Sequence, residues 1–148
     1  MLETIPKNEI LLSSEFSKRL IELIEKAKNS IHIFMFDWRW YKDDFSCDVS
    51  LINQALVRAY RRGVEVKALL NYYELLETLA PLGIKAKKAN IKKLLHAKSI
   101  VIDNDIAIIG SHNLSNQAMR ENVEISVVIY DKEICTRIKN YFDQIWRS

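Results

Sequence analysis

Hydrophobic residues recur along the chain with two periods, one typical of helices and one typical of strands. A polar stretch over residues 1–10 precedes Ser13 and Ser14, either of which is suited to cap a helix. That helix is predicted from apolar residues at helical spacing, namely Phe16, Leu20, Leu23, Ile24 and Ala27. The compact apolar run 31–36 then predicts a buried strand.

The same order of elements repeats in the middle of the chain. Asp48 is suited to cap a second helix that ends at Gly63, and its apolar side carries Ile52, Ala55, Leu56 and Ala59. Residues 64–70 predict the next strand, and residues 72–79 predict a short helix that a proline and a glycine end.

The second half of the chain is richer in strands. Residues 96–102 and 106–111 predict two strands, and the turn 103–105 between them indicates a hairpin. Residues 122–130 predict a further strand, and 132–146 an amphipathic helix. Helices before, between and after strands favour an α/β fold, with a mixed β-sheet flanked by helices on both faces. The pattern does not predict the order of the strands.

Composition places this fold in one domain. The 148 residues include three glycines and two prolines, with no linker-like stretch, so we expect a single domain over 1–148 with residues 1–10 as a tail. No apolar run is long enough to span a membrane, and the N-terminus lacks the pattern of a secretory signal, so we expect a cytoplasmic protein without membrane insertion. Cys47 and Cys135 are expected to be reduced thiols.

Positive charge is unevenly distributed. The formal net charge is +3, yet residues 61–98 carry nine Lys or Arg against three Glu. This segment indicates an anionic partner such as nucleic acid or a phospholipid head group. A solvated lysine-rich surface would give the same count, so charge alone does not decide between the two.

Three motifs carry the candidate chemistry. The first is His96-Ala-Lys98 followed by Asp103, an H-x-K-x4-D pattern. The second is Gly110-Ser111-His112-Asn113, and the third is Glu124 within Asn122-Val123-Glu124. Each lies on a predicted strand or at its end.

These motifs resemble those of the phospholipase D superfamily, whose members carry H-x-K-x4-D followed by G-S-x-N and a later Glu. The segment that carries the resemblance, 94–129, spans about a quarter of the chain. The resemblance implies a metal-independent phosphodiesterase without a cofactor. It also implies that His96, Lys98, Ser111, Asn113 and Glu124 form the catalytic site.

The residues themselves support this chemistry. Strand side chains alternate faces, so His96 and Lys98 point the same way, whereas Asp103 falls on the opposite parity and is read as a supporting residue, like Gly110. Lys98 and Asn113 can donate hydrogen bonds to the non-bridging oxygens of a phosphodiester. Ser111 shares the parity of Asn113 and can add a polar contact.

His96 needs a hydrogen-bond acceptor for the ring nitrogen that does not attack. Neutral imidazole is available as a nucleophile near neutral pH, and Glu124 can accept a hydrogen bond from its second ring nitrogen. The chain has two further histidines. We expect His112 to be structural or at the surface, and His32 to belong to the core, because it lies in an apolar strand.

The chain contains a single H-x-K pattern, and a second acid must protonate the leaving oxygen. In the resembled family two copies of the motif meet at a twofold axis. We therefore expect a homodimer in which the His96 side chains of two protomers face each other. A two-metal nuclease needs clustered carboxylates, whereas this motif offers one Glu beside lysines and histidines, so no metal requirement is predicted.

The substrate is predicted from weaker signals. Lysines before His96 could track a polyphosphate backbone, and residues after the first strand could stack on bases or pack under a loop. The residues concerned are Lys85, Lys87, Lys88, Lys92, Lys93, Trp38, Arg39 and Trp40. A nonspecific nuclease acting on DNA or RNA is the leading hypothesis. A lipid phosphodiesterase of the cardiolipin type and a catalytically silent nucleic-acid-binding module are the alternatives.

Overall fold

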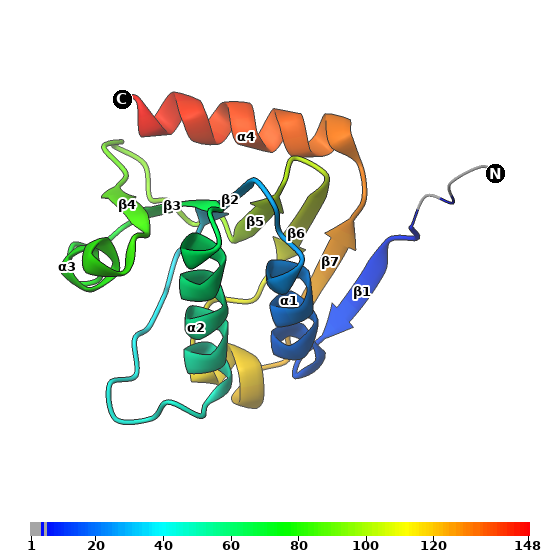
Figure 1. Ribbon diagram of the computed structural model, residues 1–148, viewed down its shortest axis with the longest axis horizontal. Coiled ribbons are helices and arrows are strands. Elements are labelled where there is room, and N and C mark those ends of the chain that lie inside the picture. Colours follow the sequence, from blue (N-terminus) through cyan, green and yellow to red (C-terminus); the bar gives the residue numbers. More distant parts are fainter. Residues whose placement is uncertain (1–3, 5) are drawn as a thin grey trace.

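A computed structural model describes residue 4 and residues 6–148 (Figure 1). The strands are β1 (Glu9–Leu12), β2 (Ser30–Phe34), β3 (Glu65–Leu70), β4 (Lys85–Lys88), β5 (Ser99–Ile102), β6 (Ile106–Gly110) and β7 (Ile125–Ile129). The helices are α1 (Glu15–Glu25), α2 (Asp48–Arg61), α3 (Leu76–Leu79) and α4 (Lys132–Trp146). Two single turns complete the described part, a 3-10 turn at Ala80–Leu82 and a π-helical turn at Gln117–Glu121.

The strands form one mixed sheet in the order β1-β7-β6-β5-β2-β3-β4. Strands β2, β3 and β4 are parallel, whereas the other neighbouring pairs are antiparallel. The parallel strands therefore end at the edge of the sheet where β5 begins, since Phe34 of β2 lies opposite both Leu69 of β3 and Ser99 of β5. This edge holds the candidate active site.

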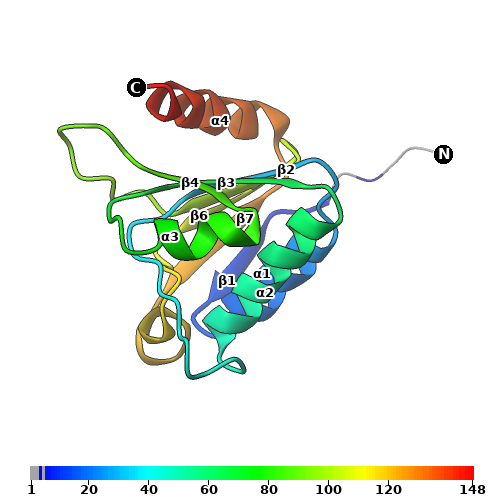
Figure 2. The ribbon, with the colours of Figure 1, turned by 60° about the vertical axis from the view of Figure 1, so that its left-hand side comes forward.

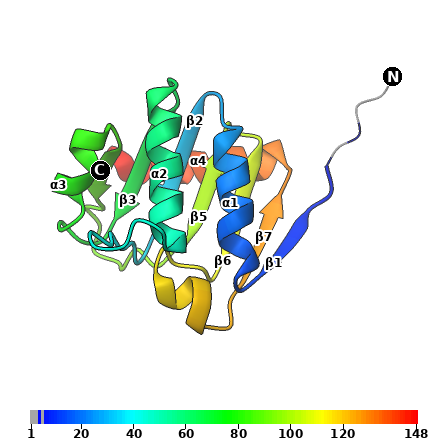
Figure 3. The ribbon, with the colours of Figure 1, turned by 60° about the horizontal axis from the view of Figure 1, so that its bottom comes forward.

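Helices cover both faces of the sheet, which confirms the predicted fold class. Helices α1 and α2 lie side by side on one face, and α4 crosses the other (Figures 2 and 3). The larger core lies under α1 and α2 and is built from their apolar residues at helical spacing, such as Leu20 and Leu56. A smaller core under α4 joins Phe34 and Leu69 to Phe142.

Several elements differ from the prediction: α3 begins at Leu76 instead of residue 72, and β7 begins at Ile125 instead of residue 122. The strand expected over 96–102 begins only at Ser99, because β2 ends opposite that residue and the chain before it has no strand to pair with. Strand β1 starts at Glu9, so the predicted tail 1–10 is too long; residues 1–3 and 5 lie outside the described residues. Strand β4 was missed because its sequence, Lys-Ala-Lys-Lys, carries the charges of an edge strand and little apolar signal.

The predicted hairpin joins β5 to β6 through Asp103 and Asn104. Both residues have positive φ, 54° and 56°, and the Asp105 N–H donates to the Ile102 carbonyl at 3.0 Å. Two left-handed residues between antiparallel strands are the geometry of a type I′ turn, which Asp and Asn tolerate well.

No helix within the described residues is long and apolar enough to cross a membrane.

Candidate active site

His96 and Lys98 lie side by side in the extended segment that enters β5. The Lys98 Nζ lies 3.3 Å from the His96 Nδ1 and donates to the His96 carbonyl oxygen at 2.9 Å. The ring of Phe36, just beyond β2, supports both groups: its centroid lies 4.7 Å from that of His96 and 5.2 Å from the Lys98 Nζ. The imidazole is exposed, so a substrate can reach it.

The ammonium of Lys98 is half-buried, and its environment favours the loss of a proton. Removal from water lowers the pKa of Lys98 below its usual range, and the negative charge of Glu124 partly opposes this shift. A less solvated cation binds an incoming anion more strongly than a fully hydrated lysine does. Lys98 is therefore well placed to hold a phosphate oxygen beside His96.

Glu124, immediately before β7, is held by its neighbours. Its carboxylate accepts a short hydrogen bond from the Ser111 hydroxyl and a second bond from the Asn122 Nδ2 at 3.2 Å. Its backbone pairs with Ser13, whose N–H donates to the Glu124 carbonyl at 2.9 Å. Among the described residues, no hydrogen bond joins Glu124 to His96, the contact that the sequence predicts. Within one protomer, the link from Glu124 to the basic pair is electrostatic, through Lys98.

Ser111 and Asn113 are positioned by the loop that follows β6. The Ser111 hydroxyl accepts from the Ile125 N–H at 3.0 Å while it donates to Glu124, so it orients the carboxylate. The Asn113 Oδ1 accepts from the Asp37 N–H at 3.1 Å. This bond leaves the NH₂ group of Asn113 as its free donor, the group that a phosphate oxygen requires.

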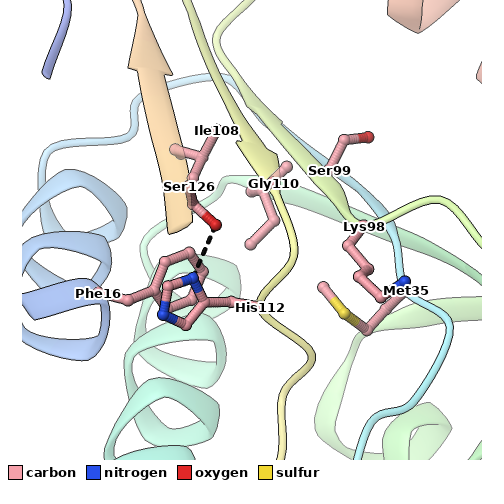
Figure 4. A pocket seen from close by; sticks show the side chains of 9 residues that line it. Phe16, Met35, Lys98, Ser99, Ile108, Gly110, His112 and Ser126 are labelled. Atoms are coloured by element: carbon pink, nitrogen blue, oxygen red, sulfur yellow. Dashed lines mark hydrogen bonds between the residues drawn. The ribbon is translucent and has the colours of Figure 1, made fainter. Parts of the chain in front are cut away.

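Gly110 allows β6 and β7 to approach closely. A Cβ at this position would lie 2.2 Å from the Ser126 Oγ and 2.4 Å from the Ile125 carbonyl oxygen. The residues around this point, including Lys98 and His112, enclose only a very small space (Figure 4). Glycine is required here by space, and the close approach places Ser111 against Glu124.

Asp103 lies at the far end of β5 from His96. Its carboxylate accepts hydrogen bonds from three successive N–H groups at the start of β2, those of Lys28 (2.8 Å), Asn29 (2.6 Å) and Ser30 (3.0 Å). The structure thus places Asp103 as an anchor between the β5–β6 turn and β2, away from His96 and Lys98.

The two remaining histidines are buried. His112 stacks on Phe16 at 4.1 Å, its Nε2–H donates to the Ser13 carbonyl, and its Nδ1 accepts from the Ser126 hydroxyl at 2.7 Å (Figure 4). His32 packs edge-on against Phe142 beneath α4. Burial lowers the pKa of both imidazoles, which favours their neutral forms. Both are core residues in this structure.

Asn71, directly after β3, is a site residue that the sequence motifs missed. Its Nδ2 donates to the Leu95 carbonyl at 2.6 Å, and its Oδ1 accepts from the Leu95 N–H at 3.1 Å. The same Nδ2 lies 3.3 Å from the Phe36 carbonyl oxygen. Asn71 therefore fixes the backbone just before His96. Its position at the end of the predicted strand 64–70 was the available signal.

The three residues Trp38, Arg39 and Trp40, which follow β2, differ in how far they are buried. Trp38 is 5% exposed, and its Nε1 donates to the Asn53 Oδ1 at 2.8 Å, so of the alternatives that the sequence left open, packing under the loop fits this side chain and stacking on bases does not. The loop backbone, which bridges to Leu114, holds the indole in the core. Trp40 is half-buried, whereas Arg39 is exposed and pairs with Asp37 at 2.9 Å.

The lysines before His96 also divide into two groups. Lys85 pairs with Glu65 at 3.4 Å, and the Lys87 Nζ lies over the Trp146 ring and donates to the Trp146 carbonyl oxygen at 3.1 Å. These two lysines are engaged on the α4 face of the sheet. Lys88, Lys92 and Lys93 lie nearer to His96 along the chain, and Lys88 is at the active-site edge because it pairs with Leu70.

The next feature is the arrangement of side chains that could coordinate a metal ion. Among the described residues, no group of three or more His, Cys, Asp or Glu side chains has the arrangement of a metal site. The two cysteines are free thiols, as expected, and burial raises the pKa of Cys135 to about 11.

Comparison with known proteins agrees with this geometry. The family model described as "Cardiolipin synthase, PLD-like domain" matches residues 20–146. The chain therefore belongs to the phospholipase D superfamily, whose members are enzymes that act on phosphodiesters. It is 30% identical over 139 residues to a phospholipase D of Rickettsia typhi, and the match covers 86% of this chain and 62% of that relative. It is also 26% identical over 111 residues to cardiolipin synthase A of Pseudomonas syringae, covering 68% of this chain and 23% of that relative.

Solved structures share the fold along nearly the whole chain. Nuc from Salmonella typhimurium, a phospholipase D family member, superposes with a TM-score of 0.78 at 22% identity over 95% of both chains. NucT from Helicobacter pylori superposes with a TM-score of 0.75 at 20% identity over 96% of both chains. TrmBL2, an archaeal chromatin protein with a novel mode of DNA binding, gives 0.64 at 18% identity over 97% of this chain and 53% of its own.

Proposed function

We propose that this protein is a metal-independent phosphodiesterase that hydrolyses nucleic acid, with His96 as its nucleophile. The observation that carries the proposal is the exposed imidazole of His96 in contact with the Lys98 ammonium at the open edge of the sheet. A phosphodiester needs a nucleophile aimed at phosphorus and donors for its non-bridging oxygens. The pair supplies both, and Asn113 adds a further donor nearby in the loop after β6.

The reaction takes two steps. An unprotonated nitrogen of His96 attacks phosphorus and forms a P–N bond, while the P–O bond to the leaving alkoxide breaks. The imidazolium of His96 in a second protomer gives that alkoxide its proton. The same imidazole, now neutral, removes a proton from water as the water oxygen attacks phosphorus. The P–N bond breaks, and both histidines return to their starting states.

The contact between Lys98 and His96 must open for the first step. An ammonium only donates, so in this arrangement the Nδ1 lone pair is occupied and the ring proton lies on Nε2. Attack through Nδ1 needs that lone pair, and attack through Nε2 needs the proton on Nδ1. Either route requires Lys98 to release Nδ1, and a bound phosphate gives its ammonium a stronger partner.

A second protomer would complete the site, and an apolar surface beside Glu124 suits it. Val123 is 93% exposed, and Leu12 and Ile125, which are register partners on β1 and β7, are 51% and 56% exposed. These three residues, here called the β1–β7 patch, are contiguous with the Ser111–Glu124 pair. Isolated exposed apolar side chains are common, but a cluster at the edge of a site indicates an interface. A second copy of the chain docked there would bring its own His96 close to this site.

The positive charge supports a nucleic acid substrate. Lys88, Lys92 and Lys93 lie in the strand and connection that lead into His96, all of them exposed. A phosphate backbone presents negative charges on both sides of the scissile bond, and these exposed lysines can bind them. A lipid phosphodiesterase is the second candidate, because the matching family model describes cardiolipin synthase and the curated relatives are named phospholipase D.

The first test uses plasmid and single-stranded DNA in excess EDTA, with His96→Ala purified in parallel. We expect cleavage by the wild type alone, with the variant reduced by at least about 10³-fold, as when a nucleophile is removed. His32→Gln is the control for loss of a histidine outside the site. If the wild type hydrolyses phospholipid vesicles but no nucleic acid, the lipid candidate replaces the proposal. Cleavage that requires Mg²⁺, or that persists in His96→Ala, contradicts the mechanism.

A further inference from the structure

A groove of about 700 Å³ opens beside the catalytic histidine. It is formed where the parallel strands β2 and β3 end and their connections to α2 and α3 begin. Phe36 and Asn71 belong both to its wall and to the support of His96: Phe36 packs on the imidazole, and Asn71 holds Leu95. A substrate bound at His96 can therefore extend past Phe36 into this groove.

The charges in the groove do not favour a phosphate chain. Its lining includes two acidic residues, Asp37 and Glu74, and two basic residues, Arg39 and Lys42, so the two signs are balanced. Asp37 is already paired with Arg39 at 2.9 Å. The cations available for phosphate lie instead at Lys98 and along the β4 connection. The groove suits the neutral part of a substrate that has its phosphate at His96.

The rings in the groove suit a flat, uncharged group. Tyr72 is 54% exposed, Trp40 is half-buried, and Phe36 closes the end next to His96. The volume falls in the range of about 300–1,000 Å³ that is usual for small-ligand sites. It can hold a base and its sugar, but not a stacked and paired duplex. Aromatic side chains of this kind bind bases of single strands without sequence preference.

We infer that this groove is a nucleobase subsite, which accepts an unstacked base next to the scissile phosphodiester and so directs the enzyme to single-stranded nucleic acid. The inference rests on the proposed nuclease function. It assigns Tyr72 as the exposed stacking surface and Asn71 as a positioning residue that links the groove wall to His96.

The test separates base from backbone. The substrates are a labelled single-stranded oligonucleotide and an oligomer of equal length in which each nucleoside is replaced by an abasic tetrahydrofuran, so that the phosphates remain. We expect wild type to cleave the base-bearing strand with the higher kcat/KM. Tyr72→Ala should lower kcat/KM for that strand by about 5- to 150-fold, the usual effect of losing one stacking ring. The same variant should barely change cleavage of the abasic oligomer, and Tyr72→Phe should restore the loss.

Tyr141→Ala is the matched control, because Tyr141 is similarly exposed, at 57%, but lies on α4 across the sheet. Equal losses on both substrates in Tyr72→Ala, or equal cleavage of both by the wild type, would overturn the base subsite while the nuclease function stands. Absence of cleavage of any strand by the wild type would overturn both. If Tyr72→Ala instead impaired only the hydrolysis of phosphatidylglycerol vesicles, the groove would belong to a lipid.

Discussion

At the scale of single residues, the H-x-K-x4-D motif separates into chemistry and anchoring. His96 and Lys98 contact each other at one edge of the sheet, whereas the carboxylate of Asp103 binds three N–H groups at the opposite edge. The spacing of the motif therefore reflects the length of β5, which must span the sheet between the two ends. Strand parity indicated this division from the sequence, but not the identity of the groups that Asp103 binds, since they lie more than seventy residues upstream.

Replacing Asp103 by Ala should lower stability and spare the chemistry. The variant loses the three hydrogen bonds to the carboxylate, and it places an alanine in a left-handed backbone conformation. Together these changes should reduce the free energy of unfolding by roughly 2–4 kcal/mol. Asp103→Asn keeps an acceptor and tolerates the left-handed conformation, so it should lose about half as much. Urea unfolding measures both changes. An Asp103→Ala protein with unchanged unfolding but lost phosphodiesterase activity would show that Asp103 acts in the reaction.

At the scale of elements, the sequence predicted the helices and strands that have a clear hydrophobic period and the site residues that belong to a motif. Strong periods identified α1, α2, α4 and the central strands, because each element buries one continuous apolar face. The sequence did not predict β1 and β4, because each has only four residues and β4 is mostly lysine, as is common in edge strands. The motif residues were found by type and spacing, whereas Asn71 and the groove depend on which strand ends meet, a property of the topology. The role of Trp38 stayed open between base stacking and packing, because composition alone does not tell a buried ring from an exposed one.

Strand β4 and the connection after it should contribute unequally to nucleic acid binding. Lys92→Ala combined with Lys93→Ala should reduce the slope of log K against log salt by about 1 to 2, because each exposed cation near the site neutralises about one phosphate. Lys85→Ala combined with Lys87→Ala removes the same charge from groups already engaged by Glu65 and Trp146, and should leave the slope nearly unchanged. Fluorescence anisotropy with a labelled oligonucleotide measures the slopes. Equal slopes for the two double variants would place the phosphate path elsewhere.

At the scale of the whole molecule, one protomer carries a single H-x-K motif, whereas the proposed mechanism needs two histidines. It has one exposed histidine and an exposed β1–β7 patch next to the carboxylate of Glu124. The larger core lies under α1 and α2, and α4 packs against β2, β5 and β6 on the other face of the sheet (Figure 2). In the proposed dimer, docking at the β1–β7 patch would bury its apolar side chains and would also bring the His96 side chains of the two protomers together.

Ile125→Lys should therefore separate the protomers and abolish activity together. An unpaired charge buried in an interface costs about 3–5 kcal/mol, enough to weaken association by at least a hundredfold. Leu51→Lys is the control, because Leu51 is an exposed apolar residue on α2, on the other face of the sheet. Light scattering after size exclusion gives the mass. A wild type that is monomeric yet fully active contradicts the dimer, whereas an Ile125→Lys protein that stays dimeric contradicts only the choice of patch.

The pairing of β1 with β7 also has a consequence for the timing of folding. Within the described residues, β1 lies at the edge of the sheet and pairs with β7 alone, and the Ser13 that follows it binds the backbone of Glu124 and the ring of His112. A ribosome that has already made the first strand must add more than a hundred residues before that strand finds its partner. The contacts of Ser13 with Glu124 and His112 can therefore form only after β7 has been made, so this part of the candidate site takes shape later than the pairing of β2 with β3.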